Sequence, residues 1–136
     1  MRYLAIDYGT RHTGLAICDL METIVSPLTV IQGQKELPEK IADIVKKENV
    51  EAIVLGMPLN MDGSEGAQAK LVLKFAKQLK EHLDIPIHYQ DERLSSFGAE
   101  NKLACAEFSR GKKRKKRIDA IAAAEILETF LEQKST

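Results

Sequence analysis

Acidic residues stand at three places where an apolar segment of the chain begins or ends. Asp7 follows Leu4-Ala5-Ile6, Asp91 and Glu92 follow a strand-like run, and Asp119 opens the last helical pattern. If these elements met at one edge of a sheet, the carboxylates would repel one another at neutral pH, and a divalent cation would relieve that repulsion. An all-oxygen ligand set suits Mg²⁺ or Mn²⁺ better than Zn²⁺. The pattern is therefore typical of metal-assisted attack on a phosphate ester.

Each of these acids also has a simpler structural explanation. Asp7 could accept hydrogen bonds from the turn that follows it, and Asp119 could stabilise a helix N-terminus. Asp91 and Glu92 are neighbours in an extended segment, so their side chains should point to opposite faces of the sheet. Only one of them is expected to face a shared site, and the residues alone leave open which one does.

The position of Asp119 in the last helical pattern makes it the most informative of these acids. It shares one helical stripe with small and apolar residues, namely Ala122, Ala123, Ile126 and Phe130. The glutamates at 125, 128 and 132 are expected on a different, solvated face. The alanines would let this helix lie close to the sheet and bring the Asp119 carboxylate toward the strand ends.

A basic tract directly precedes Asp119. Residues 110–117 contain seven of the 20 Lys and Arg residues and no acid, so the rest of this formally neutral chain is acidic. Such a tract could be ordinary solvated surface, or it could hold a phosphate backbone beside the acids. With aromatic residues at only 5%, backbone contacts are favoured over base stacking. The candidate phosphate-binding residues are Arg11, Arg93, Arg110, Lys112, Lys113, Arg114, Lys115, Lys116 and Arg117.

Composition limits the class of protein. A chain of 136 residues predicts one domain, residues 1–136. No apolar run approaches the ~20 residues that span a bilayer, and no signal peptide is visible, so we expect a cytoplasmic protein without a membrane segment. Cys18 and Cys105 are expected to be buried free thiols. The isolated histidines at 12, 82 and 88 form no nucleophile–base arrangement and are expected to be structural or solvated.

The apolar periodicity predicts an α/β fold. Strands are expected at 2–7, 13–19, 28–32, 52–56 and 85–89, the first two forming a hairpin whose turn holds Gly9 and closes at Gly14. Helices are expected at about 37–48, directly after Ser64 as the cap with apolar residues between 71 and 83, from Ser95 or Ser96 to near Glu107, and at about 118–131 after the basic segment. This order predicts a mixed sheet with helices on both faces.

Four segments together resemble the YqgF/RuvX family. The opening pattern Asp-x-Gly-x-x-Arg-x-Gly-x-Ala is matched by Asp7, Gly9, Arg11, Gly14 and Ala16. The others are 56–66, 91–95, and Asp119 with Ala122, Ala123, Ile126 and Leu127. The resemblance covers the chain from end to end and implies a three-layer, RNase H-like fold with a five-stranded mixed sheet.

The resemblance also implies a function. It identifies Asp7, Glu92 and Asp119 as the metal-binding acids of a Mg²⁺- or Mn²⁺-dependent nuclease that matures the 5′ end of precursor 16S rRNA. Its partners would be precursor rRNA or branched DNA and a pre-ribosomal particle, and it would be a monomer or weak homodimer. Two alternatives stay open: a Holliday junction resolvase-like endonuclease, and a non-catalytic RNA-binding factor on a nuclease scaffold. The Asp7-Tyr8-Gly9-Thr10 segment also resembles the phosphate loop of sugar kinases, but the chain is too short for their second domain.

Overall fold

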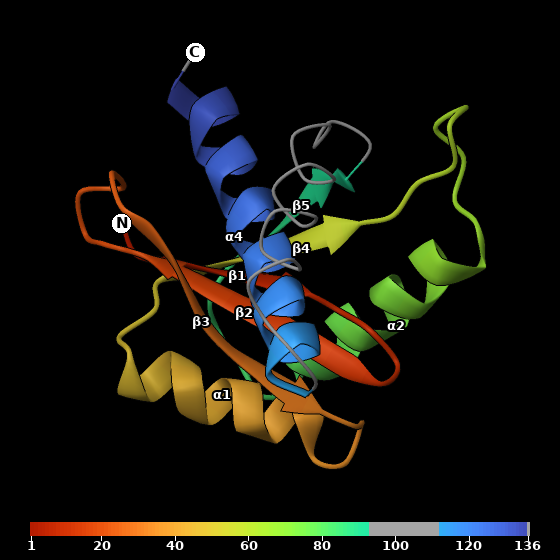
Figure 1. The fold of residues 1–136 in the computed structure, drawn as a ribbon, viewed down its shortest axis with the longest axis horizontal. Helices are drawn as coiled ribbons and strands as arrows, with labels where there is room; N and C mark the ends of the chain where they lie inside the picture. The colour runs from red at the N-terminus through yellow and green to blue at the C-terminus, as the bar shows by residue number, and fades with distance from the viewer. Residues whose placement is uncertain (93–111, 136) are drawn as a thin grey trace.

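A five-stranded mixed sheet forms the centre of the protein (Figure 1). The computed structural model describes residues 1–92 and 112–135, and side chains in the helix are described from residue 120 onward. The strands are β1 (Tyr3–Asp7), β2 (His12–Cys18), β3 (Val25–Gln32), β4 (Ala52–Met57) and β5 (Ile87–Asp91), and the helices are α1 (Leu37–Lys47), α2 (Ala67–Lys80) and α4 (Lys112–Ser135). The order in the sheet is β3-β2-β1-β4-β5. Strands β1, β2 and β3 pair antiparallel, whereas β4 pairs parallel with both β1 and β5.

Helices cover both faces of the sheet, as predicted. Alternate residues of β1 enter two separate cores: Leu4 and Ile6 pack on the side of α1 and α2, and Tyr3 and Ala5 pack on the side of α4. Strand β4 divides in the same way and is buried over its whole length, as its continuous apolar run predicted. Burial on both faces fixes the register of β4 because a slip by one residue would exchange its two cores. The residues at the carboxyl ends of β1 and β4 are therefore held in place by strands that are packed on both faces.

Strand β3 is longer than predicted. It begins at Val25 and not at residue 28, so Pro27 lies inside the strand, opposite Ala16 and next to a register shift in β2. The prediction placed the start of this strand after the proline. Proline has no backbone N–H to donate to a neighbouring strand. Because β3 is the edge strand, it has no neighbour on its outer side, and a proline is tolerated there.

Helix α2 begins later than the capping prediction required. Its N-cap residue is Gly66, with no side-chain cap, and the first helical residue is Ala67. Ser64 instead accepts a hydrogen bond from Asn60 Nδ2 and donates one to Asp62 Oδ1. The prediction of Ser64 as a helix cap was therefore wrong, because its hydroxyl is used inside the preceding loop.

Helix α4 begins six residues earlier than predicted, at Lys112. Most of the basic tract is thus the first part of a helix and not a segment before it, in agreement with the good helix propensity of Lys and Arg. The prediction for Glu125 was also wrong: its exposure is only 8%, and residues 122–127 are buried without interruption. The helix is therefore covered all round at this level, and of the three glutamates only Glu128 and Glu132 are exposed.

The remaining predictions concern the cysteines, the third helix and a membrane segment. Cys18 is buried and free, as expected, and accepts a hydrogen bond from the backbone N–H of Tyr3. The predicted helix at about 95–107, together with Arg93, Cys105 and Arg110, lies outside the described residues. No helix in the described part of the chain is long and apolar enough to cross a membrane.

Candidate active site

Two of the predicted acids stand at the same edge of the sheet. Strands β1, β4 and β5 run parallel, so their carboxyl ends share one edge, the usual place for a site in an open α/β sheet. Asp7 is the last residue of β1, and Glu92 follows the last residue of β5. Strand β4 separates them. Its pairing of Leu55 with Ile6, continued by one residue, brings Gly56 beside Asp7.

The carboxylate of Glu92 lies over that glycine. A Cβ added to Gly56 would stand 3.0 Å from Glu92 Oε1 and 2.6 Å from Ile126 Cδ1 of α4. Glu92 therefore lies on the α4 face of the sheet. By strand alternation Asp7 belongs to the same face, since Tyr3 and Ala5 pack in the core against α4.

The absence of a side chain at Gly56 allows Glu92 to lie over β4. Neighbouring strands are roughly 4.8 Å apart, so residues on the two strands that flank β4 are separated by about 10 Å at the backbone. Any other side chain at position 56 would fill that interval, whereas the glycine lets Glu92 reach over β4 toward β1. Asp7 and Glu92 are both half-buried, as suits groups that line a site open to a substrate.

The choice between Asp91 and Glu92 follows from the register. Asp91 is the last residue of β5 and is paired with Met57, whose side chain belongs to the core beneath α1 and α2. Alternation therefore directs Asp91 to the face away from α4. Of the two neighbouring acids, Glu92 is the one that shares a face with Asp7.

Asp119 belongs to the helix that packs on this face. It precedes Ile126 by seven residues, about two helical turns, and so lies on the same stripe of α4. Its side chain lies outside the described residues. Among the side chains of residues 1–92 and 120–135, no three His, Cys, Asp or Glu residues gather closely enough to hold a metal ion.

The chemistry of the donors fits a hard divalent cation. The described residues bring two carboxylates to one face, and the Glu92 carboxylate lies where a side chain on Gly56 would crowd it. Carboxylate oxygens are the ligands that Mg²⁺ and Mn²⁺ prefer, and neither thiol nor imidazole is among the predicted ligands. The set of acids is thus compatible with the predicted metal.

Arg11 lies in the turn that follows Asp7. This turn is tight: a Cβ on Gly9 would stand 2.3 Å from the carbonyl oxygen of His12, so only glycine fits. Thr13 Oγ1 donates to the carbonyl of Gly9 at 3.3 Å. The side chain of Arg11 is exposed, and its carbonyl accepts a hydrogen bond from Gly33 N–H at 2.8 Å. Among the predicted phosphate-binding residues, Arg11 is the one whose side chain the structure describes.

A loop between β4 and α2 belongs to the same sheet edge, and none of its residues is among the predicted site residues. Its backbone is held by hydrogen bonds from Asn60 N–H to the Ser64 carbonyl and from Gly63 N–H to the Asn60 carbonyl. Gly63 has φ +88°, in the left-handed region that favours glycine. The exposed side chain of Met61 stands on this loop, 91% accessible. In the sequence, the density of turn-forming residues directly after a buried strand indicates this loop.

Gln90 is a second residue that the site prediction missed. It is paired with Gly56 on β5 and is only 4% exposed. A buried amide two residues before Glu92, on the same face, adds a polar group beside the acids. Its signal in the sequence was weak, because a single glutamine in a short strand is equally common on an exposed face.

The three histidines belong to separate elements, as expected: His12 begins β2, His82 follows α2 and His88 lies in β5. His82 pairs with Glu39 at 3.3 Å, and His88 contacts the ring of Phe130 on α4 at a centroid distance of 5.4 Å.

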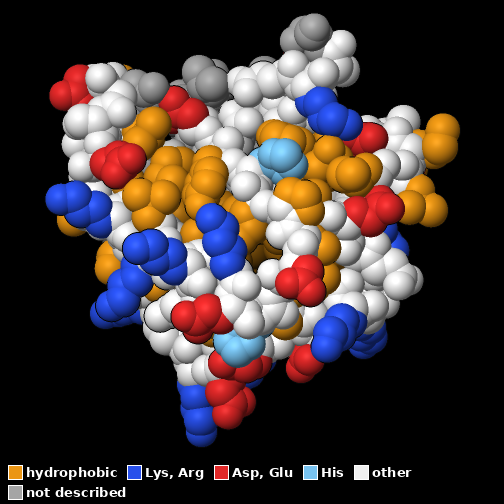
Figure 2. All heavy atoms as spheres, turned by 180° about the vertical axis from the view of Figure 1, so that it is seen from behind, with side chains coloured by type: hydrophobic (Ala, Val, Ile, Leu, Met, Phe, Trp, Pro, Cys, Tyr) orange, Lys and Arg blue, Asp and Glu red, His pale blue; other side chains and the backbone are white. Residues whose placement is uncertain are grey.

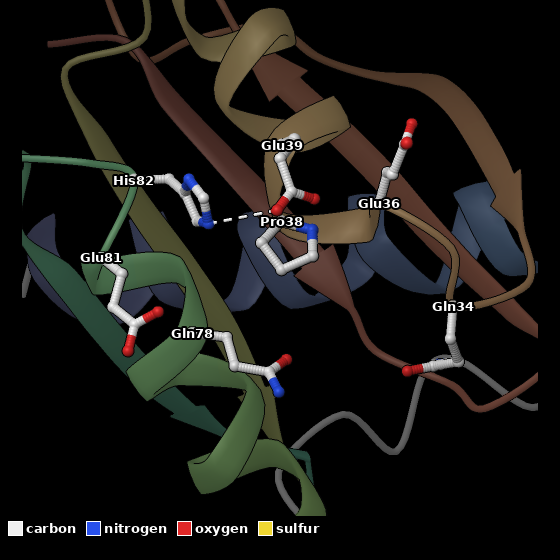
Figure 3. A pocket seen from close by; sticks show the side chains of 7 residues that line it. All are labelled: Gln34, Glu36, Pro38, Glu39, Gln78, Glu81 and His82. Carbon is white, nitrogen blue, oxygen red and sulfur yellow. Dashed lines mark ion pairs between the residues drawn. The ribbon is translucent and has the colours of Figure 1, made fainter.

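A cavity of about 370 Å³ beside His82 lies between α1 and α2, on the other side of the sheet from α4 (Figure 3). Seen from behind, Lys and Arg side chains and Asp and Glu side chains both surround a central apolar area (Figure 2).

Similar proteins agree with this architecture. The sequence matches the family described as "RuvX: Holliday junction resolvase" over residues 1–133. A "Putative pre-16S rRNA nuclease" of Caldanaerobacter subterraneus subsp. tengcongensis is 44% identical over 135 residues, which cover 97% of this chain and 96% of that protein. A protein of the same name from Desulforamulus reducens is 42% identical over 135 residues, 97% of each chain.

Solved structures share the fold at low identity. Thermus thermophilus RuvC is 14% identical with a TM-score of 0.62, over 100% of this chain and 98% of that one. The Fowlpox virus resolvase, solved with Holliday junction DNA, is 13% identical with a TM-score of 0.63 over the whole of both chains. The RNase H-like fold that the motifs implied is confirmed. With its full-length family match and its relatives above 40% identity, the chain belongs to the RuvX family.

Proposed function

We propose that this protein is a metal-dependent nuclease that hydrolyses phosphodiester bonds in precursor 16S rRNA, at its 5′ end. Membership of the RuvX family and the RNase H-like fold support the nuclease class. The names of the relatives from Caldanaerobacter and Desulforamulus support rRNA as the substrate. The observation that carries the proposal is the approach of Glu92 to Gly56, which brings a second carboxylate to the face that Asp7 shares.

Asp7 and Glu92 would hold Mg²⁺ or Mn²⁺ with their carboxylate oxygens, together with Asp119 from α4. When bound, the ion supplies activation of water and neutralisation of the charge that develops on the phosphate. The half-buried position of both acids limits competition by bulk water for the ligand positions. Because Gly56 has no side chain, the Glu92 carboxylate can lie over β4, on the face that Asp7 shares.

The cationic residues would position the substrate strand. Arg11 is exposed directly after the strand that ends in Asp7, and Lys112 to Arg117 form the first turns of α4. Arg93 and Arg110 complete the set. Contacts of this kind bind the backbone and carry no base specificity by themselves. Specificity for precursor rRNA would then come from the shape of the RNA or from a pre-ribosomal particle that presents it.

The test is cleavage of a 5′-extended 16S rRNA fragment with Mg²⁺ or Mn²⁺, comparing the wild type with Asp7→Asn and Glu92→Gln. Both variants keep the size of the side chain and remove its charge, so we expect the cleavage rate to fall at least 100-fold without loss of the fold. Equal rates for the wild type and Asp7→Asn would show that the activity belongs to a contaminant.

Asp91→Asn is the matched control for Glu92→Gln. It removes the same charge one residue away, from a position that alternation directs to the other face of the sheet, so it should keep activity within about twofold. If Asp91→Asn abolished cleavage and Glu92→Gln did not, the assignment of the acids would be wrong.

Cleavage of four-way DNA junctions is the second candidate function. The description of the matching family and the fold shared with the Fowlpox virus resolvase favour it. Two symmetric cuts in a junction need two active sites, so this activity requires a dimer. Junction cleavage by the wild type without RNA cleavage would select this function. Binding of RNA without any metal-dependent cleavage would select a non-catalytic factor.

A further inference from the structure

Gln34 joins the segment before α1 to the turn that follows Asp7. Its Nε2 donates to the carbonyl oxygens of Gly9 at 2.9 Å and of Thr10 at 3.2 Å. Its Oε1 accepts a hydrogen bond from the hydroxyl of Tyr8 at 2.8 Å. One side chain thus contacts three successive residues of the turn, although it is 24 or more residues away in sequence.

The contact with Tyr8 extends this connection to α2. The ring of Tyr8 stacks on Phe75 with a centroid distance of 4.4 Å and an interplanar angle of 24°. Phe75 is 2% exposed and belongs to the core beneath α2. Because its ring is held on one side and its hydroxyl on the other, Tyr8 has little freedom to move. Tyr8 also directly follows Asp7 in the chain, so its position limits that of Asp7.

A second link fixes the far end of the turn. Gly33, next to Gln34, donates its backbone N–H to the carbonyl of Arg11 at 2.8 Å. The segment 33–34 therefore contacts the turn at residues 8 to 11, between Asp7 at the end of β1 and His12 at the start of β2. Thr13 Oγ1 also donates to the carbonyl of Gly9 at 3.3 Å, whereas the side chains of Thr10 and Arg11 are exposed.

We infer that Gln34 is a positioning residue, which holds the turn at 8–11 so that Asp7 and Arg11 keep the orientation needed for cleavage. This inference rests on the proposed nuclease function. Gln34 lies on the side of α1 and α2 and lines the cavity between these helices (Figure 3). It acts on Asp7 and Arg11 through the turn and is not itself a catalytic residue.

Gln78 offers a matched control because it lines the same cavity. It carries the same side chain, is also exposed, and makes no side-chain hydrogen bond within the described part of the chain. Gln34→Ala and Gln78→Ala therefore remove the same group from one surface. Only the first removes contacts to the turn.

The experiment measures kcat and KM of both variants on the precursor rRNA fragment, with thermal unfolding of each. We expect Gln34→Ala to lower kcat by about 10-fold to 100-fold, the loss that a small misplacement of a catalytic group causes, with KM changed less than threefold. Gln78→Ala should behave as the wild type, and both variants should unfold at similar temperatures. Equal kcat for the two variants would overturn the inference, and so would a loss in Gln34→Ala that only follows the fraction unfolded.

A double-mutant cycle with Tyr8→Phe tests the route of the effect. This substitution removes the hydroxyl and keeps the ring that stacks on Phe75. If Gln34 acts partly through Tyr8, the losses in kcat of Gln34→Ala and Tyr8→Phe will be less than multiplicative. Fully multiplicative losses would show that the hydrogen bond between them plays no part.

Hydrogen exchange separates this inference from the proposed function. The amides of residues 8–11 should exchange faster in Gln34→Ala than in the wild type and Gln78→Ala, whether or not the protein cleaves RNA. Unchanged exchange would overturn the inference even if the nuclease assay succeeds. If the wild type does not cleave RNA or junction DNA, the proposed function fails while the exchange data still decide whether Gln34 holds the turn.

Discussion

Glu92 Oε1 lies 3.0 Å from the point at which a Cβ on Gly56 would stand. This proximity connects the ends of β4 and β5 with α4, because Ile126 Cδ1 stands 2.6 Å from the same point. A Cβ contact below 3.0 Å is not tolerated without movement, so residue 56 must be glycine if both neighbours are to keep their places. The glycine therefore determines where the carboxylate can lie.

We expect Gly56→Ala to displace the Glu92 carboxylate and to lower the cleavage rate more than 10-fold, since catalytic groups misplaced by about 1 Å lose up to 100-fold. The clash with Ile126 should also destabilise the protein by about 1–3 kcal/mol, as overpacking does. Measurements of kcat and of urea unfolding check both effects.

Ile126→Val in the Gly56→Ala background separates the two clashes. It removes the Cδ1 atom that stands closest and leaves the contact with Glu92. Stability should recover in part while kcat stays low. Full recovery of kcat in this double variant would mean that Glu92 tolerates the added methyl group and that its position against Gly56 is unimportant.

Gly9 and Gly33 form a second pair of glycines that should respond differently to alanine. At Gly9 the new Cβ would stand 2.3 Å from the carbonyl oxygen of His12, so the turn after Asp7 must open. At Gly33 no atom lies within 4 Å, and the cost is only that of a φ of +78°, about 1–2 kcal/mol. Gly9→Ala should therefore lose activity at least 10-fold, whereas Gly33→Ala should lose stability with little change in kcat. Comparable kcat values for the two variants would contradict this.

The sequence predicted the sheet well because its signals were local. The continuous apolar runs of β4 and β1 are both explained by burial on the two faces of the sheet. The start of β3 was wrong because the effect of Pro27 depends on whether the strand is at an edge, which is a property of the whole sheet. The prediction that Glu125 is solvated was wrong for the same reason, because helical spacing cannot show that α4 is covered on every side at that level.

The candidate site could be predicted in part. The types of Asp7 and Glu92 and their places at strand ends were readable, but the choice of Glu92 over Asp91 needed the family resemblance until the register was known. The role of Gln34 was not readable at all. Its contacts with Gly9 and Tyr8 join segments that no periodicity connects.

Asp19 predicts a pH dependence of stability at the other end of β2. Hydrogen bonds from the Ile24 backbone N–H and from Thr23 lower the pKa of Asp19 from 3.8 to about 2. A carboxylate with a depressed folded-state pKa stabilises the protein above its unfolded-state pKa, and that stabilisation is lost as the pH falls toward the folded-state value. The difference in unfolding free energy between the wild type and Asp19→Ala should thus be constant from pH 7 to about pH 5 and shrink between pH 4 and pH 2.

Asp43→Ala is the control for this measurement. Asp43 is exposed on α1 and makes no side-chain hydrogen bond or ion pair in the described part of the chain. Asp43→Ala therefore removes one carboxylate without removing any hydrogen bond of the kind that Asp19 accepts. A flat difference for Asp19→Ala across that range would show that the hydrogen bonds to its carboxylate do not persist in solution.

The basic start of α4 predicts how RNA binding depends on salt. Each phosphate contact by Lys or Arg releases counterions, so the slope of log K against log salt concentration reports the number of such contacts. Lys115→Gln with Lys116→Gln should reduce that slope by about 1–2 and weaken binding without favouring any sequence. Lys46→Gln with Lys47→Gln, in the last turn of α1, is the matched control because it removes two adjacent lysines from a helix on the other side of the sheet. Filter binding of the precursor rRNA fragment between 50 and 200 mM salt measures both slopes. An equal reduction by the two pairs would mean that RNA follows the overall charge of the protein and not the helix that carries Asp119.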